Sequence, residues 1–303
     1  MKGERNMNFI LKKMMSGSKD KSVFGNLIVM DDTVVPCPDE LTLTEDVPYK
    51  EIPGGQIMAD IIRPKNSEGR LPIAINIHGG ALVFGDHRME RTFGFELAKR
   101  GYLVYNIDYR HIDKADGFEE LDDVLKGLAF VKQTAAEYGG DTDRIYVMSE
   151  SAGAFLALYA TAAANSSEVR RAYGCIDPGI NVKALVCASG MLYVSTSFFI
   201  GLVYRKEFYG ERRRDKKFMK YTDPEFSGIM NALPPVFLTT SKGDFLRRST
   251  KKYVKALRGA GHPHRYMYFD SDELKHAFPF LLPMLPQSRE VLGEIDKWIR
   301  NIV

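Results

Sequence analysis

Residues 148–158, MSESAGAFLAL, decide how the rest of this 303-residue chain is interpreted. The stretch leaves a short apolar run and enters a series of very small residues. A serine at the junction of a strand and a helix, followed by Ala152 and Gly153, is typical of a sharp turn that exposes the serine hydroxyl. The pattern favours Ser151 as a nucleophile, with a serine that only caps the helix as the alternative. Ser149 is rejected, because only Ser151 is followed two residues later by glycine.

Strand-like and helix-like runs alternate from about residue 56 to the end of the chain. The predicted strands are 56–62, 71–77, 102–107, 145–148, 184–187, 235–240 and 265–269. The predicted helices are 117–138, 151–165 and about 288–302, and Asp116 with Glu119 resembles a capping box at the start of the first. The alternation predicts an α/β fold with a mostly parallel central sheet and helices on both faces. The ligand site of such a sheet lies at the carboxyl ends of its strands.

Composition and charge exclude several classes of protein. The net charge of +3 is too near balance to indicate nucleic-acid binding. Cys37, Cys175 and Cys187 show no CxxC spacing, which argues against a disulfide framework and against a zinc site, so no metal is expected. The basic N-terminus lacks the apolar centre of a signal peptide, and no run approaches the ~18 apolar residues of a membrane span. We therefore expect a cytoplasmic protein without stable membrane insertion.

A nucleophilic serine needs a base, and the base needs an orienting acid. Among the six histidines, His276 is favoured because it follows the last predicted strand, so that nucleophile, acid and base come in chain order. Asp244, directly after an apolar run and a glycine turn, is the leading acid. Asp270 and Asp272 remain competitors, because they lie close to His276 in the sequence.

The run INIHGGAL, residues 75–82, supplies a third element of the site. Two glycines after a buried strand free the backbone to turn N–H groups toward a ligand. We expect the N–H groups of Gly79, Gly80 and Ala152 to form an oxyanion hole, in which each donor contributes about 3–4 kcal/mol to lowering the barrier. His78 is then a residue that stabilises this loop rather than the base.

Taken together, these motifs resemble the α/β-hydrolase fold, and more narrowly the hormone-sensitive-lipase-like esterases and lipases, over about residues 50–303. The matching motifs are His78-Gly79-Gly80-Ala81, Asp108-Tyr109-Arg110, Asp143-Arg144-Ile145, Ser149-Glu150-Ser151-Ala152-Gly153, Gly243-Asp244-Phe245-Leu246-Arg247 and His276-Ala277-Phe278.

The resemblance implies Ser151 as the nucleophile, His276 as the general base and acid, and Asp244 as its orienter. It also implies a hydrolase domain over 46–303, capped by residues 1–45 and by an insertion over 191–233. The sequence departs from the family where Ser149 replaces a glycine, where Ala81 replaces a third glycine, and after Arg110, where HIDK stands in place of the usual LAPE. These departures bear on the subfamily and the substrate.

The predicted cap offers aromatic side chains, among which Phe198, Phe199 and Tyr204 are expected to contact an apolar acyl group; anchoring of the cap to the body is the alternative. Residues 205–220 hold eight Lys or Arg against three acidic residues. Such a run is usually a solvated face, and an acidic substrate or anionic surface is the sharper hypothesis.

The expected function is cleavage of carboxylic esters with short to medium acyl chains, without a metal or organic cofactor. The expected partners are a small-molecule ester and, through the family resemblance, a second copy of the chain in a homodimer. An amidase or formamidase that uses the same triad is the alternative. A non-catalytic binding protein on the same scaffold is a third hypothesis, although such proteins typically lose a member of the triad.

Overall fold

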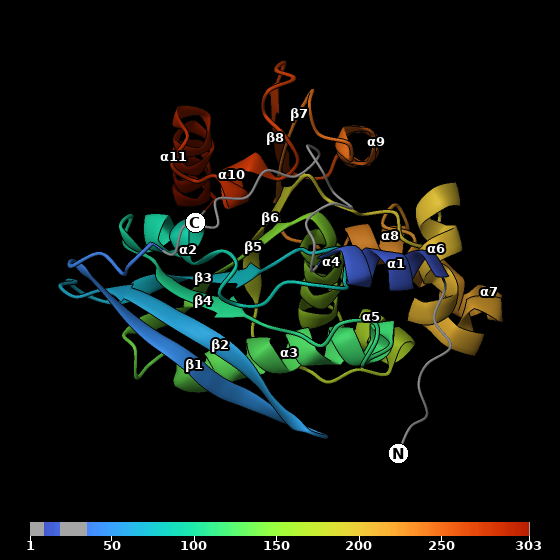
Figure 1. The fold of residues 1–303 in the computed structure, drawn as a ribbon, viewed down its shortest axis with the longest axis horizontal. Coiled ribbons are helices and arrows are strands. Elements are labelled where there is room, and N and C mark those ends of the chain that lie inside the picture. Colours follow the sequence, from blue (N-terminus) through green and yellow to red (C-terminus); the bar gives the residue numbers. More distant parts are fainter. Residues whose placement is uncertain (1–8, 19–34, 303) are drawn as a thin grey trace.

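One eight-stranded sheet forms the centre of the computed structural model, which describes residues 9–18 and 35–302 (Figure 1). The strand order is β1-β2-β4-β3-β5-β6-β7-β8. The first two strands pair antiparallel with each other and β2 with β4, and all later pairs are parallel. The strands are β1 (Leu41–Ile52), β2 (Gly55–Pro64), β3 (Leu71–Ile77), β4 (Leu103–Ile107), β5 (Gly140–Glu150), β6 (Val182–Ala188), β7 (Val236–Ser241) and β8 (His264–Phe269).

The predicted α/β fold is confirmed, and every predicted strand overlaps a strand of the sheet. The strand β1 is not predicted from the sequence. It lies at the edge of the sheet, most of its side chains are at least partly exposed, and its register shifts twice against β2. Leu41, Leu43, Val47 and Tyr49 alternate with polar residues, but Glu45, Asp46 and Pro48 interrupt the pattern, and only an edge strand tolerates such a proline. The expected domain boundary at residue 45 falls inside β1.

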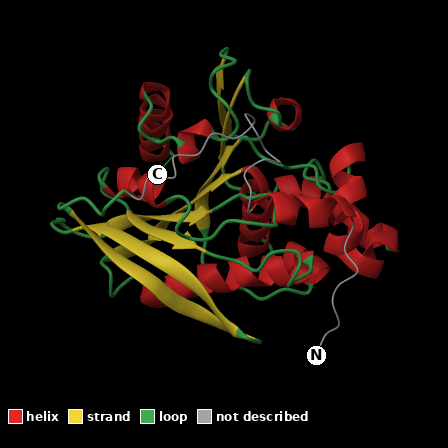
Figure 2. Cartoon of the chain, viewed as in Figure 1, coloured by secondary structure: helices red, strands yellow, loops and turns green. Residues whose placement is uncertain are grey.

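Helices cover both faces of the sheet (Figure 2). On one face, α3, α4 and α9 pack with the insertion in the larger core cluster; on the other, α2, α10 and α11 form a second cluster. The predicted capping box is present, because Asp116 accepts from the N–H of Glu119 and Glu119 accepts from the N–H of Asp116. The helices are α1 (Phe9–Ser18), α2 (Arg91–Ala98), α3 (Gly117–Thr134), α4 (Ser151–Asn165), α5 (Ser167–Tyr173), α6 (Phe198–Tyr209), α7 (Lys216–Met219), α8 (Ser227–Met230), α9 (Arg247–Gly259), α10 (Phe278–Leu281) and α11 (Pro286–Arg300).

The segment between β6 and β7 contains α6, α7 and α8, which gather at one end of the sheet (Figure 1). Buried aromatic rings attach this segment to the body. Phe208 on α6 packs against Phe155 on α4 with ring centroids 4.9 Å apart. Gly117 begins α3 where a Cβ atom would lie 1.9 Å from the ring of Phe208, so glycine is required there. These contacts support the anchoring interpretation of the aromatic residues in the insertion.

Candidate active site

Ser151 stands at the junction of β5 and α4 in a left-handed backbone conformation, with φ = 50°. Such a conformation costs a non-glycine residue roughly 1–2 kcal/mol. Gly153 makes the turn possible, because a Cβ atom there would lie 2.2 Å from the Ile77 carbonyl oxygen and 2.3 Å from that of His78. Ser149, by contrast, points into the sheet, where its hydroxyl donates to the Val186 carbonyl at 2.6 Å.

Three side chains remote in sequence meet at the carboxyl ends of β5, β7 and β8. Ser151 Oγ lies 2.8 Å from His276 Nε2, and His276 Nδ1 lies 2.7 Å from Asp244 Oδ1. With the ring proton on Nδ1, the imidazole donates to the carboxylate and accepts from the serine hydroxyl. This arrangement allows a proton to pass from the hydroxyl to the imidazole while the carboxylate fixes the ring and stabilises the cation that forms.

The Asp244 carboxylate is buried and fully supplied with donors. Thr240 Oγ1 donates to Oδ2 at 2.5 Å, and the Leu246 N–H donates to Oδ1 at 2.9 Å. Burial alone would raise the pKa of Asp244, but the hydrogen bond and charge of His276 hold that pKa below its ordinary value. Asp270 and Asp272, the competing acids, are exposed, and Asp272 pairs with Lys242 at 2.6 Å.

The loop that carries His276 is held in place by its neighbours. Ala277 has φ = 53°, and its N–H donates to Ser189 Oγ at 3.0 Å. A Cβ atom at Gly243 would lie 2.5 Å from the Asp272 carbonyl oxygen, so the acid and base loops touch through their backbones. The ring of Phe245 covers the imidazole at 4.2 Å between centroids and is 44% exposed, which makes it the solvent-facing neighbour of His276.

The HGGA loop, residues 78–81, lies beside the serine, and one of its predicted roles needs correction. The Gly79 N–H donates to Glu150 Oε1 at 2.7 Å, so it is already engaged and is not a free oxyanion donor. In the described part of the chain, the N–H groups of Gly80, Ala81 and Ala152 donate to no protein acceptor. These three donors, rather than Gly79, remain available to a ligand.

His78 anchors the HGGA loop, as the sequence predicts. Its Nδ1 lies 2.9 Å from the Gly79 carbonyl and its Nε2 lies 3.2 Å from Asp108 Oδ1, while its ring stacks on Tyr109 at 4.5 Å. Burial works to lower the pKa of His78, but the hydrogen bond and charge of Asp108 raise it overall. The Tyr109 hydroxyl adds a bond at 2.8 Å to the His78 carbonyl.

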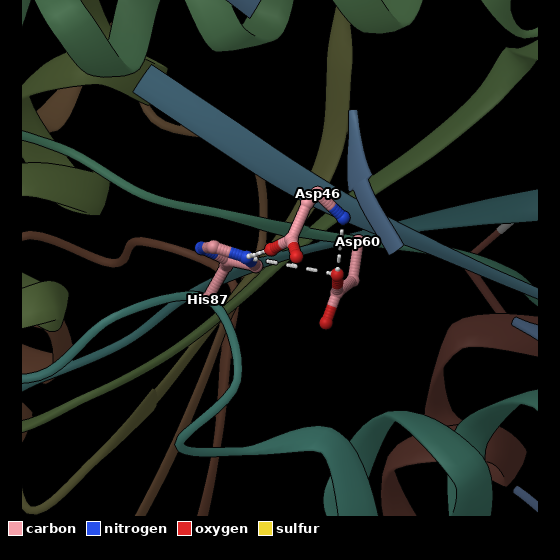
Figure 3. Close-up of side chains that lie close together, drawn as sticks. All are labelled: Asp46, Asp60 and His87. Carbon is pink, nitrogen blue, oxygen red and sulfur yellow. Dashed lines mark hydrogen bonds and ion pairs between the residues drawn. The ribbon is translucent and has the colours of Figure 1, made fainter. Parts of the chain in front are cut away.

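A second polar cluster fastens the segment after this loop to the edge of the sheet (Figure 3). His87 Nε2 donates to Asp46 Oδ1 at 2.8 Å, and Asp60 Oδ1 lies 3.7 Å away. One histidine with two carboxylates is ligand chemistry for a divalent metal, but both carboxylates already have cationic partners. Arg88 binds Asp46 at 2.6 Å and Arg91 binds Asp60 at 2.6 Å. The cluster is therefore an ion-pair network between β1, β2 and the start of α2.

The insertion contacts the HGGA loop through one of the predicted acyl-binding residues. Tyr204 is only 3% exposed, and its hydroxyl donates to the Ala81 carbonyl at 2.7 Å. It is therefore a buried link between α6 and the loop. The side chains of Phe198 and Phe199 lie outside the described part of the structure.

The basic run on the insertion is partly structural. The guanidinium of Arg212 lies 4.1 Å from the ring centroid of Phe218, and it donates to the Ala172 carbonyl at 2.9 Å. Arg214 pairs with Glu211 at 2.5 Å. These contacts account for two of the eight cations without invoking an acidic substrate.

Several residues of the site are not apparent from the sequence. Thr240 and Ser189 act through tertiary contacts with the acid and base loops, and no spacing pattern marks them. Phe245 lies in a motif that the family resemblance includes, but its contact with His276 is visible only in the folded chain. Asp108 and Tyr109 lie in a motif that the family resemblance includes, although their contacts with His78 are visible only in the folded chain. Glu90 carries no sequence signal at all.

The BD-FAE family profile matches residues 59–244, more than half of the chain. The chain belongs to the BD-FAE family. It is 27% identical to the probable isoprenylcysteine alpha-carbonyl methylesterase ICMEL1 of Arabidopsis thaliana, over 80% of this chain and 52% of that protein. The chain thus spans about half the length of that relative.

Two solved structures share the fold of this BD-FAE family member. Esterase B from Lactobacillus rhamnosis superposes with a TM-score of 0.85 at 19% identity, covering 97% of this chain and 95% of the other. Brefeldin A esterase, a bacterial homologue of human hormone sensitive lipase, gives a TM-score of 0.71 at 16% identity, covering 100% of this chain and 88% of the other. The fold is therefore that of the α/β-hydrolases. None of the helices in the described ranges combines the length and apolar character that a membrane crossing requires.

Proposed function

We propose that this protein is a serine hydrolase that cleaves carboxylic esters. The observation that carries the proposal is the unbroken chain of hydrogen bonds from Ser151 through His276 to Asp244, with distances of 2.8 and 2.7 Å. The relative and the two structural neighbours named above are esterases by name, which supports the same reaction class. The free N–H groups of the HGGA loop and of Ala152 suit the charge that develops during acyl transfer.

In the proposed reaction, Ser151 Oγ attacks the carbonyl carbon of the ester while His276 Nε2 accepts the hydroxyl proton. The carbonyl oxygen becomes an oxyanion that accepts from the N–H groups of Gly80, Ala81 and Ala152. His276 then gives its proton to the departing alcohol, which leaves an acyl-serine. Water, deprotonated by His276, attacks the acyl group; the bond to Ser151 Oγ breaks, Oγ takes the proton back from His276, and the carboxylic acid is released.

The proposed substrates are small esters with short to medium acyl chains. The insertion over 191–233 is proposed to cap the site, since Tyr204 joins α6 directly to the HGGA loop. Phe245, which is exposed and lies against His276, is the described aromatic side chain best placed to meet an apolar group of the substrate. Because this chain spans only about half of the cited methylesterase, that protein's substrate is not carried over.

The test is the Ser151→Ala variant, assayed with p-nitrophenyl butyrate and matched to the wild type by circular dichroism. We expect at least about a thousandfold loss of kcat with the fold retained, because loss of the nucleophile in a serine hydrolase typically costs more than that. A fluorophosphonate probe should label Ser151 in the wild type and nothing in the variant. Turnover that survives in Ser151→Ala would remove Ser151 from the mechanism. A matched anilide in the same assay separates the ester hydrolase from the amidase.

A further inference from the structure

Two glutamates lie buried against each other beneath the HGGA loop. Glu90 is 1% exposed and Glu150 is 2% exposed, and the charge of Glu90 acts on Glu150. Among the described residues, Glu90 Oε1 is buried and has no hydrogen-bond partner. Two ionised carboxylates offer only acceptors, so a proton on one of the two acids supplies the donor that Glu90 Oε1 lacks. A pair of like charges in a buried site favours the same state, in which the two acids hold one proton between them.

The two glutamates also contact different parts of the structure, Glu150 the HGGA loop and Glu90 the strand β3. Glu150 Oε1 accepts from the Gly79 N–H at 2.7 Å, and a Cβ atom at Gly79 would lie 2.0 Å from that oxygen, so the glycine leaves the space that the carboxyl group fills. Glu90 Oε2 accepts from Asn76 Nδ2 on β3 at 2.7 Å. Glu90 occupies the N-cap of α2 but makes no side-chain cap. Its carboxyl group is turned inward to the sheet and to Glu150.

We propose that Glu90 is a positioning residue, which shares a proton with Glu150 and thereby keeps the Glu150 carboxyl group on the Gly79 N–H. This contact fixes the HGGA loop, whose next two N–H groups are the proposed oxyanion donors. The inference rests on the proposed function, because its effect on turnover requires that oxyanion hole. Loss of the shared proton places two negative charges side by side, and Glu150 then leaves Gly79 or adds charge beside the developing oxyanion.

The titratable groups that face the pair come from three other loops. His78 interacts with Glu90, Asp244 interacts with Glu150, and the charges of both glutamates raise the pKa of Tyr109. Among the described residues, no Lys or Arg pairs with either glutamate. Burial raises the pKa of both glutamates, and for Glu150 the charge of Glu90 adds to the effect.

The kinetic experiment compares Glu90→Gln, Glu150→Gln and Glu90→Ala with the wild type on p-nitrophenyl butyrate from pH 5 to pH 10. Glutamine at either position supplies a permanent N–H to the remaining carboxylate and keeps the outer acceptor. We expect kcat of the wild type to fall at alkaline pH, and both Gln variants to lose that fall. At neutral pH, Glu90→Ala should lose at least tenfold in kcat with KM within threefold, and Glu90→Gln should recover most of that loss. Glu96→Gln, a buried glutamate at the other end of α2, is the matched control and should keep the wild-type profile.

A second readout does not depend on activity. A carboxyl group whose pKa is raised by folding stabilises the protein below the ordinary glutamate pKa of about 4.3, and that contribution is lost as the pH rises through its folded-state pKa. Glutamine at position 90 does not titrate there. The difference between the urea midpoints of Glu90→Gln and the wild type should therefore increase steadily as the pH rises above 5. The same difference for Glu96→Gln should stay constant.

The outcomes separate the two proposals. A wild type that neither turns over esters nor reacts with the fluorophosphonate probe contradicts the proposed function, while the urea series still tests the shared proton. The positioning role of Glu90 is overturned if the wild type is active and reacts with the fluorophosphonate probe, but both Gln variants keep the fall in kcat at alkaline pH. Equal losses of kcat in Glu90→Gln and Glu90→Ala overturn it as well. An alkaline fall in kcat that came from His78 would persist in both Glu90→Gln and Glu150→Gln. The two variants therefore distinguish His78 from the glutamate pair.

Discussion

Strained single residues gather around the candidate site. Outside glycine, the described residues with left-handed backbone are Asp46, Ala81, Leu82, Ser151, Ser189 and Ala277, and all except Asp46 border the serine, the HGGA loop or the histidine loop. Each such residue costs roughly 1–2 kcal/mol, which the surrounding structure must offset. Conformations of this kind cluster where side chains must be presented to a ligand. The strain is thus concentrated where the proposed chemistry occurs.

Gly153→Ala tests how tightly the elbow is built. Its Cβ atom would press on two backbone carbonyls, those of Ile77 and His78, which cannot move without displacing β3 and the HGGA loop. We expect the variant to lose at least about 1–3 kcal/mol of unfolding free energy and most of its kcat. Chemical denaturation by urea, followed by tryptophan fluorescence or circular dichroism, measures the first quantity.

Gly293→Ala on α11 is the matched control for that substitution. Nothing lies within 4 Å of a Cβ atom at this exposed helical position. Helix propensity alone should then stabilise the protein by about 0.5–1 kcal/mol. If Gly153→Ala were as stable as the wild type, the close contact at the elbow would not limit the backbone there.

Residues whose role follows from their place in a motif were predictable, and residues whose role depends on a tertiary partner were not. Ser151, Asp244 and His276 each follow a strand, and the parallel sheet brings the carboxyl ends of those strands together. The sequence predicts the Gly79 N–H as an oxyanion donor because it does not show that the Glu150 carboxyl group reaches that N–H. Glu90 meets Glu150 across 60 positions of sequence, and neither residue type nor spacing indicates that contact.

At the scale of the elements, periodic helices and buried strands are the parts that the sequence predicts best. The helix α4 begins and ends where the run of small residues predicts, and α3 begins after the predicted capping box. The strand β1 is missed because it is exposed and irregular. The short helices of the insertion have no long apolar period, so their arrangement depends on the aromatic cluster that they bury.

The link between α6 and the HGGA loop gives a prediction at this scale. Tyr204→Phe keeps the buried ring and removes only the hydroxyl that donates to the Ala81 carbonyl. We expect a loss of about 0.5–1.5 kcal/mol in unfolding free energy and a decrease of several fold in kcat for p-nitrophenyl butyrate, because the loop loses a fixed point. Tyr221→Phe is the control, since its hydroxyl binds Glu168 on α5 instead. Equal kcat values for the two variants would contradict a role of this link in turnover.

At the scale of the whole molecule, the sheet begins earlier than the sequence suggests, and this decides where the chain can be shortened. Residues 41–45 belong to β1, Leu41 is 2% exposed, and Glu45 pairs with Arg91 at 2.7 Å. Deletion of residues 1–35 leaves β1 whole, whereas deletion of residues 1–45 removes its first five residues. Both deletions remove α1, so their difference reports residues 36–45, which are the first five residues of β1 and the five that precede it.

We expect the chain that lacks residues 1–45 to be less stable than the chain that lacks residues 1–35 by at least about 2 kcal/mol. Burial of a leucine side chain alone is worth about 1.5–3 kcal/mol. Thermal unfolding followed by circular dichroism compares them directly. A panel of p-nitrophenyl esters of increasing acyl length, run on the longer chain and on the full protein, then reports whether the N-terminal segment contributes to the cap. Equal midpoints for the two deletions would mean that residues 36–45, the start of β1 included, do not contribute to stability.

The hydroxyl of Tyr204 has a consequence for anyone who wishes to redesign this protein. Because Tyr204 on α6 donates to the carbonyl of Ala81, the segment proposed to cap the site is joined directly to the loop that carries the proposed oxyanion donors. We therefore expect libraries restricted to residues 191–233 to change kcat together with acyl selectivity. Grafts of this segment from a relative should carry Tyr204 with them, or be accompanied by a second round of mutation at positions 80–82.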